Sequence, residues 1–151
     1  MTTARTGRGA GHSDRTVGLT QDAGWEIGVS RTIDTPLEAV WAFLTGRDGI
    51  AVWLGGGLTL PAEKGTGYTT PDGTRGELRS FHPGDRIRLT WQPTTWDHPS
   101  TVQVATRARG EKTLLRFHQE RLCDSAEREQ QRQHWSAVLQ TVVEELEQSG
   151  R

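Results

Sequence analysis

Two polar side chains, Arg31 and Gln119, fall at strand positions that the sequence predicts to face the protein interior. Apolar residues alternate with polar ones along Trp25–Ile33, and Arg31 shares the apolar phase, as Gln119 does after Phe117. A buried charge without a partner is costly, so an inward guanidinium needs an acid or a ligand. In one interpretation, Arg31 holds a ligand carboxylate or enolate and Gln119 orients it. In the other, a bulge turns Arg31 outward, or an acid such as Glu77 pairs with it.

The residue types that bind metals or act as nucleophiles form no recognisable motif. His118, Glu120 and Cys123 match no structural zinc spacing, and strand alternation places the first two on the outer face. Cys123 is the single cysteine, so the chain cannot form an internal disulfide, and no base or orienting group marks it as a nucleophile. We therefore predict no metal, no cofactor and no identifiable catalytic residue. The remaining central histidines are predicted to be solvated surface residues: His82, His98 and His134.

The composition excludes several classes of partner. The net charge is −1, and the basic residues form no cluster, so nucleic-acid binding is not predicted. No apolar run approaches the roughly 20 residues that a membrane span needs, and the N-terminus lacks the apolar core of a secretory signal. The glycine-rich stretches 55–57 and 65–67 precede no long helix, which argues against a nucleotide loop. We expect a cytoplasmic protein with no nucleic-acid partner and no membrane insertion.

The elements that must position these residues form one domain. Residues 1–22 are polar and glycine-rich and are predicted to be a flexible tail, and residues 23–149 are predicted to be the domain. After the first strand, Thr35, Pro36 and Glu38 signal a helix start with a capping box, and a second helical turn precedes the glycines at 55–57. From there to Leu122, alternating segments and turns at 71–73 and 82–85 predict an antiparallel meander.

The last segment, from about Ser125 to Gln148, is predicted to be a long amphipathic helix. Asp124 and Glu127 fit a capping box at its start. One apolar stripe runs along it: Trp135, Val138, Leu139, Val142, Val143 and Leu146. This helix needs an apolar surface to cover, and the meander offers one.

Large side chains gather on the predicted inner surfaces. Those predicted to point inward are Trp53, Phe81, Trp91, Phe117, Trp135 and Leu139, and Trp96 occupies a loop at the predicted mouth. Aromatic residues at such positions either line a ligand cavity or fill the core.

Several segments carry a family resemblance: IDTPLEAVWAFLT (33–45), WLG (53–55), GE (76–77), RIRLTW (86–91), STV (100–102) and Trp135. Together they resemble the activator-of-heat-shock-protein-ATPase-like family. Its superfamily includes START-type lipid-transfer domains, polyketide cyclases and birch-pollen-allergen proteins. The similarity covers about residues 25–148. One departure is Pro99, where many relatives carry an acidic residue, and the resemblance supplies no catalytic motif.

The resemblance implies an α+β helix-grip fold, in which a curved antiparallel sheet of six or seven strands wraps a long C-terminal helix. It also implies an apolar cavity between sheet and helix, lined by the seven large side chains named above. The predicted function is therefore binding of a small hydrophobic molecule. Two alternatives remain. One is a stress- or chaperone-related module that binds a protein partner, including a second copy as a homodimer. The other is a cyclase-like enzyme that acts on a bound polyketide or similar ligand through Arg31 or Gln119.

Overall fold

The computed structural model describes residues 19–20 and 24–149. The predicted tail, residues 1–22, lies outside the described residues except for Leu19 and Thr20. These two residues form a short strand, β1 (Leu19–Thr20), which pairs with the start of the next strand. The predicted boundary of the ordered domain therefore lies close to a sheet edge.

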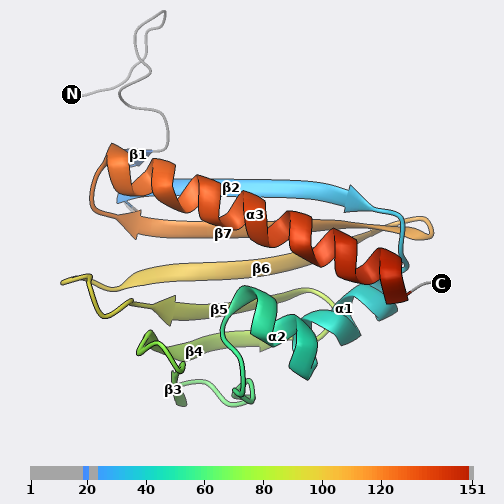
Figure 1. The fold of residues 1–151 in the computed structure, drawn as a ribbon, viewed down its shortest axis with the longest axis horizontal. Coiled ribbons are helices and arrows are strands. Elements are labelled where there is room, and N and C mark those ends of the chain that lie inside the picture. The colour runs from blue at the N-terminus through green and yellow to red at the C-terminus, as the bar shows by residue number, and fades with distance from the viewer. Residues whose placement is uncertain (1–18, 21–23, 150–151) are drawn as a thin grey trace, which may run out of the picture.

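The described strands form one antiparallel sheet in the order β1-β2-β7-β6-β5-β4-β3 (Figure 1). The strands after β1 are β2 (Gly24–Ile33), β3 (Gly67–Thr69), β4 (Arg75–His82), β5 (Arg86–Trp91), β6 (Ser100–Arg109) and β7 (Lys112–Leu122). The predicted α+β helix-grip fold with its antiparallel meander is confirmed. Because β2 crosses over to pair with β7, the first long strand and the last one are neighbours.

The turns form where the sequence predicts them. The Gly73 amide donates to the Thr70 carbonyl oxygen at 2.9 Å, and the Asp85 amide donates to the His82 carbonyl oxygen at 2.9 Å. At Gly76 the sheet requires glycine, because a Cβ atom there would lie 1.9 Å from the Thr90 carbonyl oxygen. These features let β3, β4 and β5 pair as neighbours, with a register shift in β4 between Leu78 and Ser80.

Two short helices follow β2: α1 (Leu37–Thr45) and α2 (Arg47–Trp53). The predicted capping box at Thr35 is wrong. Pro36 is the N-cap residue, and no side chain caps the helix. The Thr35 carbonyl oxygen instead accepts a hydrogen bond from the Thr113 hydroxyl at 2.7 Å, which ties the helix start to β7. Proline suits this position because its missing N–H is not needed at a helix start.

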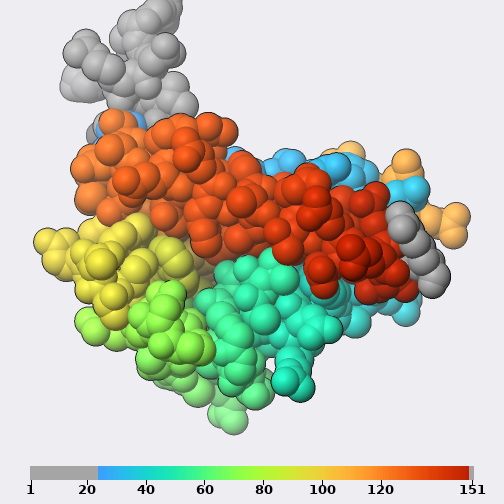
Figure 2. Space-filling view, in the orientation of Figure 1, coloured from blue at the N-terminus to red at the C-terminus, as the bar shows by residue number. Residues whose placement is uncertain are grey.

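The long helix α3 (Ser125–Ser149) packs over β2 and β7 and also contacts α2. Its 25 residues span about 37 Å. The Asp124 carboxylate accepts the Glu127 amide at 2.8 Å, so the predicted cap is confirmed. Figure 1 shows α1 and α2 beside α3 on the same side of the sheet. In Figure 2 the β5–β6 loop adjoins the first half of α3 at one end of the molecule.

A bulge reshapes the end of β7 just before α3. Trp25 pairs with Leu122 and Ile27 with Gln119, so two residues of β7 face the single residue Glu26 of β2. Arg121, one of those two, has a φ of 67°, which few non-glycine residues adopt. The bulge turns the chain into the connection that carries Cys123 and Asp124.

Candidate functional site

Gln119 faces inward as predicted, and its side chain is fully buried under α3. Its carbonyl oxygen accepts two hydrogen bonds, from the Trp135 indole at 2.7 Å and from the Gln131 amide at 3.0 Å. Its amide donates to the Ser100 hydroxyl at 2.9 Å, which donates in turn to the Trp91 carbonyl oxygen at 2.6 Å. The polar atoms of Gln119 are therefore engaged by the protein itself, and the network links β5, β6, β7 and α3.

A chain of aromatic contacts runs from this network to the surface. The Trp135 ring stacks on Phe117, with ring centroids 5.1 Å apart, and lies 6.2 Å from the Trp91 ring. Trp91 contacts Trp96 edge to face at 5.3 Å and His134 at 6.0 Å. Trp135 and Phe117 are buried, whereas Trp96 is half-buried and His134 is exposed. We call Trp91, Trp96, His134 and Trp135 the aromatic junction.

Trp96 sits on the loop between β5 and β6, which local bonds hold in place. Its amide donates to the Pro93 carbonyl oxygen at 3.0 Å, and its own carbonyl oxygen accepts from the Gln92 side chain at 2.9 Å. Its ring also stacks on His98 at 4.9 Å. The outer edge of the aromatic junction is thus built from a turn rather than from a strand or helix.

The other predicted lining residues lie farther along the same core. Trp53 and Leu139 are buried, and the Trp53 indole donates to the Leu44 carbonyl oxygen at 2.8 Å. Phe81 is half-buried and contacts Trp41 of α1 at 5.9 Å. All seven predicted side chains belong to one apolar cluster or pack against it. Their role as ligand contacts stays a prediction, because these same contacts also pack the core.

Arg31 is exposed, although the alternation of apolar residues along its strand predicted that it faces inward. Its guanidinium donates to the Gln140 side-chain oxygen of α3 at 2.7 Å, so it lies on the helix side of the sheet but at an exposed rim. The reason is that β1 pairs only with Gly24 and Trp25, which leaves the rest of β2 at the sheet edge. Glu77, its suggested partner, instead pairs with Arg79 at 2.9 Å. Arg31 and Gln119 are therefore not brought together.

The residues considered for a metal or a nucleophile separate into two places. His118 lies 2.9 Å from Glu26, and Glu120 pairs with Arg88, so neither is near Cys123. Cys123 meets Glu127 instead: its thiol donates to the carboxylate at 3.3 Å. Desolvation and the nearby carboxylates of Glu127 and Asp124 raise the pKa of the Cys123 thiol to about 11. A protonated thiol is a poor nucleophile, so this arrangement does not support thiolate catalysis.

A separate pocket of about 520 Å³ is lined mostly by residues of β3, β4 and β5. Thr90 and Gln92, which line it, alternate along the chain with Trp91 of the aromatic junction. The Tyr68 hydroxyl donates to the Thr90 carbonyl oxygen at 2.5 Å, and burial raises the pKa of that hydroxyl. Several lining residues are polar or charged: Arg75, Glu77, Thr90 and Gln92. This pocket does not match the predicted apolar cavity.

Solved structures with the same fold share low sequence identity with this chain. DynU16, from the dynemicin biosynthetic locus, is 20% identical with a TM-score of 0.69, and the match covers 81% of this chain. The chain spans only 47% of the length of that protein. CalU16 from Micromonospora echinospora is 17% identical with a TM-score of 0.64, over 78% of this chain and 71% of its own. At these identities the likeness shows the fold.

A third solved structure shares the fold, and a family model matches most of the chain. The Aha1 dimer from Colwellia psychrerythraea is 13% identical with a TM-score of 0.59, over 78% of this chain and 92% of its own. The family model described as activator of Hsp90 ATPase homolog 1-like protein matches residues 34–147. No protein with a curated description matches the chain. Among residues 19–20 and 24–149, no helix is long and apolar enough to cross a bilayer.

Proposed function

The chain belongs to the activator of Hsp90 ATPase homolog 1-like family, and on that premise we propose that it binds a small hydrophobic molecule between its sheet and α3. The molecule carries a flat ring system and enters at the aromatic junction. There, Trp96 and His134 form the rim, and Trp91 forms the floor. This location refines the predicted cavity to one end of the sheet–helix interface.

The observation that carries this proposal is the half-buried position of Trp96 on a turn, in edge-to-face contact with the buried Trp91. Rings favour such stacked or edge-to-face contacts by about 0.5–1.5 kcal/mol beyond the area that they bury. A ligand ring can replace the contact between Trp96 and Trp91 with its own contacts to these rings at little cost in free energy. Deeper entry would disrupt the Trp135–Phe117 stack and the Gln119 network, so the ligand is expected to remain at the rim.

The test is a titration of the full chain with flat polyketides, flavonoids and fatty acids, followed by the indole N–H signals in NMR spectra. The signals of Trp91 and Trp96 are expected to shift saturably with a flat compound. The signal of Trp53, whose indole donates to Leu44, is expected to stay in place. The variant Trp96→Ala should weaken binding about tenfold, equivalent to about 1.4 kcal/mol from one lost ring contact.

Trp41→Phe is the matched control, because Trp41 is also half-buried and contacts one aromatic ring, Phe81, but belongs to α1. This variant should bind the ligand as the parent does. The proposal is wrong if no compound gives a saturable shift, or if Trp96→Ala and Trp41→Phe bind equally well.

The two alternative functions stay predictions. For the cyclase-like alternative, which uses Arg31 or Gln119, Arg31 lies at the exposed rim and donates to Gln140, and the Gln119 side chain is engaged by the core. The homodimer version of the protein-partner alternative predicts a mass in light scattering that rises with concentration. The ligand proposal predicts no such rise in mass.

A further inference from the structure

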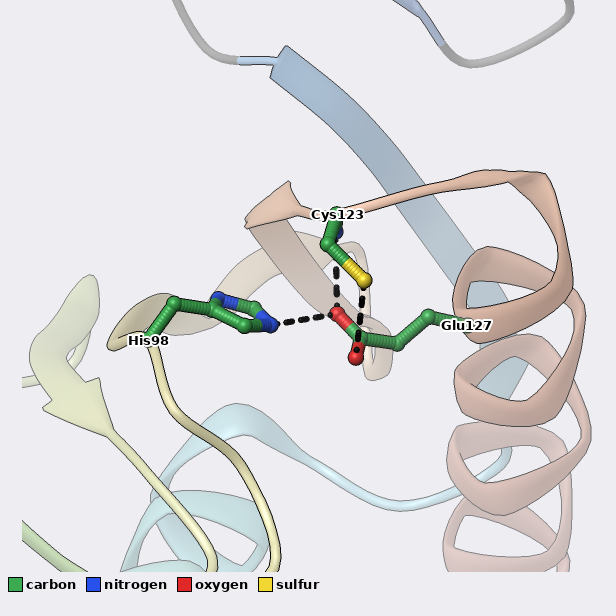
Figure 3. Close-up of side chains that lie close together, drawn as sticks. All are labelled: His98, Cys123 and Glu127. Carbon is green, nitrogen blue, oxygen red and sulfur yellow. Dashed lines mark hydrogen bonds and ion pairs between the residues drawn. The ribbon is translucent and has the colours of Figure 1, made fainter.

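Three side chains with metal-binding atoms meet where the β5–β6 loop approaches the start of α3 (Figure 3). They are His98 from the loop, Cys123 from the connection after β7, and Glu127 from the first turn of α3. One ligand atom from each lies within 4.8 Å of the other two. The sequence analysis missed this group because it combined Cys123 with residues near it in the chain.

The sheet register explains why these residues meet. Strands β6 and β7 are antiparallel, and Thr101 pairs with Glu120 near their ends. The segments that carry His98 and Cys123 continue from these two strands at the same end of the sheet. Glu127 then reaches back from α3, and its carboxylate accepts the Cys123 amide at 2.9 Å. The shared end of β6 and β7 and the contact between Glu127 and Cys123 therefore bring the three residues together.

The His98 ring is held with one nitrogen directed into the group. Its Nδ1 lies 3.1 Å from the Pro99 carbonyl oxygen, which only accepts hydrogen bonds, so Nδ1 carries the proton. A neutral ring of this tautomer presents a lone pair at Nε2, the form in which histidine binds a metal, whereas a protonated ring pairs with Glu127 through Nε2. The Trp96 ring stacks on His98 and fixes its plane.

That Nε2 atom is buried and lies 2.9 Å from the Glu127 Oε1 atom, which is an ion-pair distance when the ring is protonated. In the neutral ring, a lone pair would face a carboxylate oxygen, which also only accepts. Such a pair of acceptors is unfavourable unless a proton on Nε2 or a metal cation lies between them. Among the described residues, the ion pair of Glu127 is with His98, so a metal cation at this place would replace the Nε2 proton of that pair.

We propose that His98, Cys123 and Glu127 bind a zinc-type divalent cation through Nε2, Sγ and a carboxylate oxygen. Imidazole, thiolate and carboxylate are the three ligand types that zinc prefers, whereas magnesium and calcium take oxygen ligands. With three protein ligands, a tetrahedral ion keeps its fourth position for water or another small ligand. When the metal–sulfur bond forms, the thiol proton passes to solvent.

The distances suit this ion after a small adjustment. Zinc–sulfur and zinc–nitrogen bonds of about 2.3 and 2.0 Å place tetrahedral ligand atoms roughly 3.5 Å apart. The thiol and the carboxylate are already 3.3 Å apart, and the largest separation in the group, up to 4.8 Å, must shorten by about 1 Å. Cys123 is exposed on a connection between two elements, so its side chain has room to move.

The test uses the full chain, reduced and stripped of metal with a chelator, and titrated with Zn²⁺ alone by calorimetry. We expect one zinc ion per chain. His98→Gln and Cys123→Ser should each weaken zinc binding by at least about tenfold, since even residues that only support a ligand change affinity 10- to 100-fold. Co²⁺ should give a thiolate-to-metal absorption band in the parent that is lost in Cys123→Ser.

His118→Gln is the matched control. His118 lies 2.9 Å from Glu26, the same separation as in the proposed site, but no sulfur accompanies that pair. This variant should bind zinc as the parent does. Absence of stoichiometric zinc binding, absence of the Co²⁺ band, or equal weakening by His98→Gln and His118→Gln would each overturn the proposal. Because no ring ligand is present, the result is independent of the proposed function.

Discussion

The Gln119 network gives the sharpest test of how the core is built, through the variant Gln119→Leu. Leucine nearly matches the volume of glutamine but leaves the Trp135 indole and the Gln131 amide without their shared acceptor. Each unpaired buried donor costs about 1–3 kcal/mol. Added apolar burial offsets part of this cost, about 1–2 kcal/mol. We expect the free energy of unfolding to fall by about 3 kcal/mol, measured by urea denaturation with circular dichroism.

A double-mutant cycle identifies the bond responsible. Trp135→Phe removes the indole donor, so Gln119→Leu should cost about 1 kcal/mol less in that background. The control is Gln140→Leu, at an exposed glutamine that accepts from Arg31 and donates to Glu144, and it should change stability by less than about 0.5 kcal/mol. If Gln119→Leu were as mild as this control, and no coupling appeared, the Gln119 amide would be free for a ligand. The account of the core would then be refuted.

Two further predictions concern the cap and the surface of α3. Asp124→Ala should lower the free energy of unfolding by about 1 kcal/mol. Asp124→Asn keeps a capping oxygen and should change that free energy by only about a few tenths of a kcal/mol. Equal losses for the two variants in urea denaturation would contradict the cap. Desolvation against Trp91 lowers the pKa of His134, so the unfolded chain binds more protons and stability falls as pH drops below about 6.5. His134→Gln should flatten the pH dependence of unfolding between roughly pH 7 and 5, and an unchanged slope would contradict this.

Most of the fold could be predicted because its signals are local and periodic. The alternation in β5 and the apolar stripe of α3 each predicted an element and its buried side. The cap of α1 was mispredicted because threonine, proline and glutamate form a local signal that a long-range bond overrides. The Thr35 carbonyl oxygen binds Thr113, 78 residues away, and the helix starts accordingly.

The candidate site was predicted less well because its geometry depends on pairing between distant strands. The alternation of residues along the strand placed Gln119 inward, but it did not show that Ser100, Gln131 and Trp135 bind its amide. Phase also could not show that Arg31 lies at a sheet edge. The one local signal that bears on His98, Cys123 and Glu127 is the capping pattern before α3, which fixed Glu127 beside Cys123 and did not indicate the loop histidine.

The position of Trp96 separates stability from binding in this domain. Its ring contacts Trp91 on one side and His98 on the other, so it links the buried aromatic stack to the exposed residues at the start of α3. The buried side is held by the Gln119 network and should tolerate little change. The outer side consists of a turn and an exposed connection, whose side chains add little to the core. A ring ligand or a metal ion bound there would therefore alter the environment of Trp96 without altering the sheet, and substitutions at this rim should change binding more than folding.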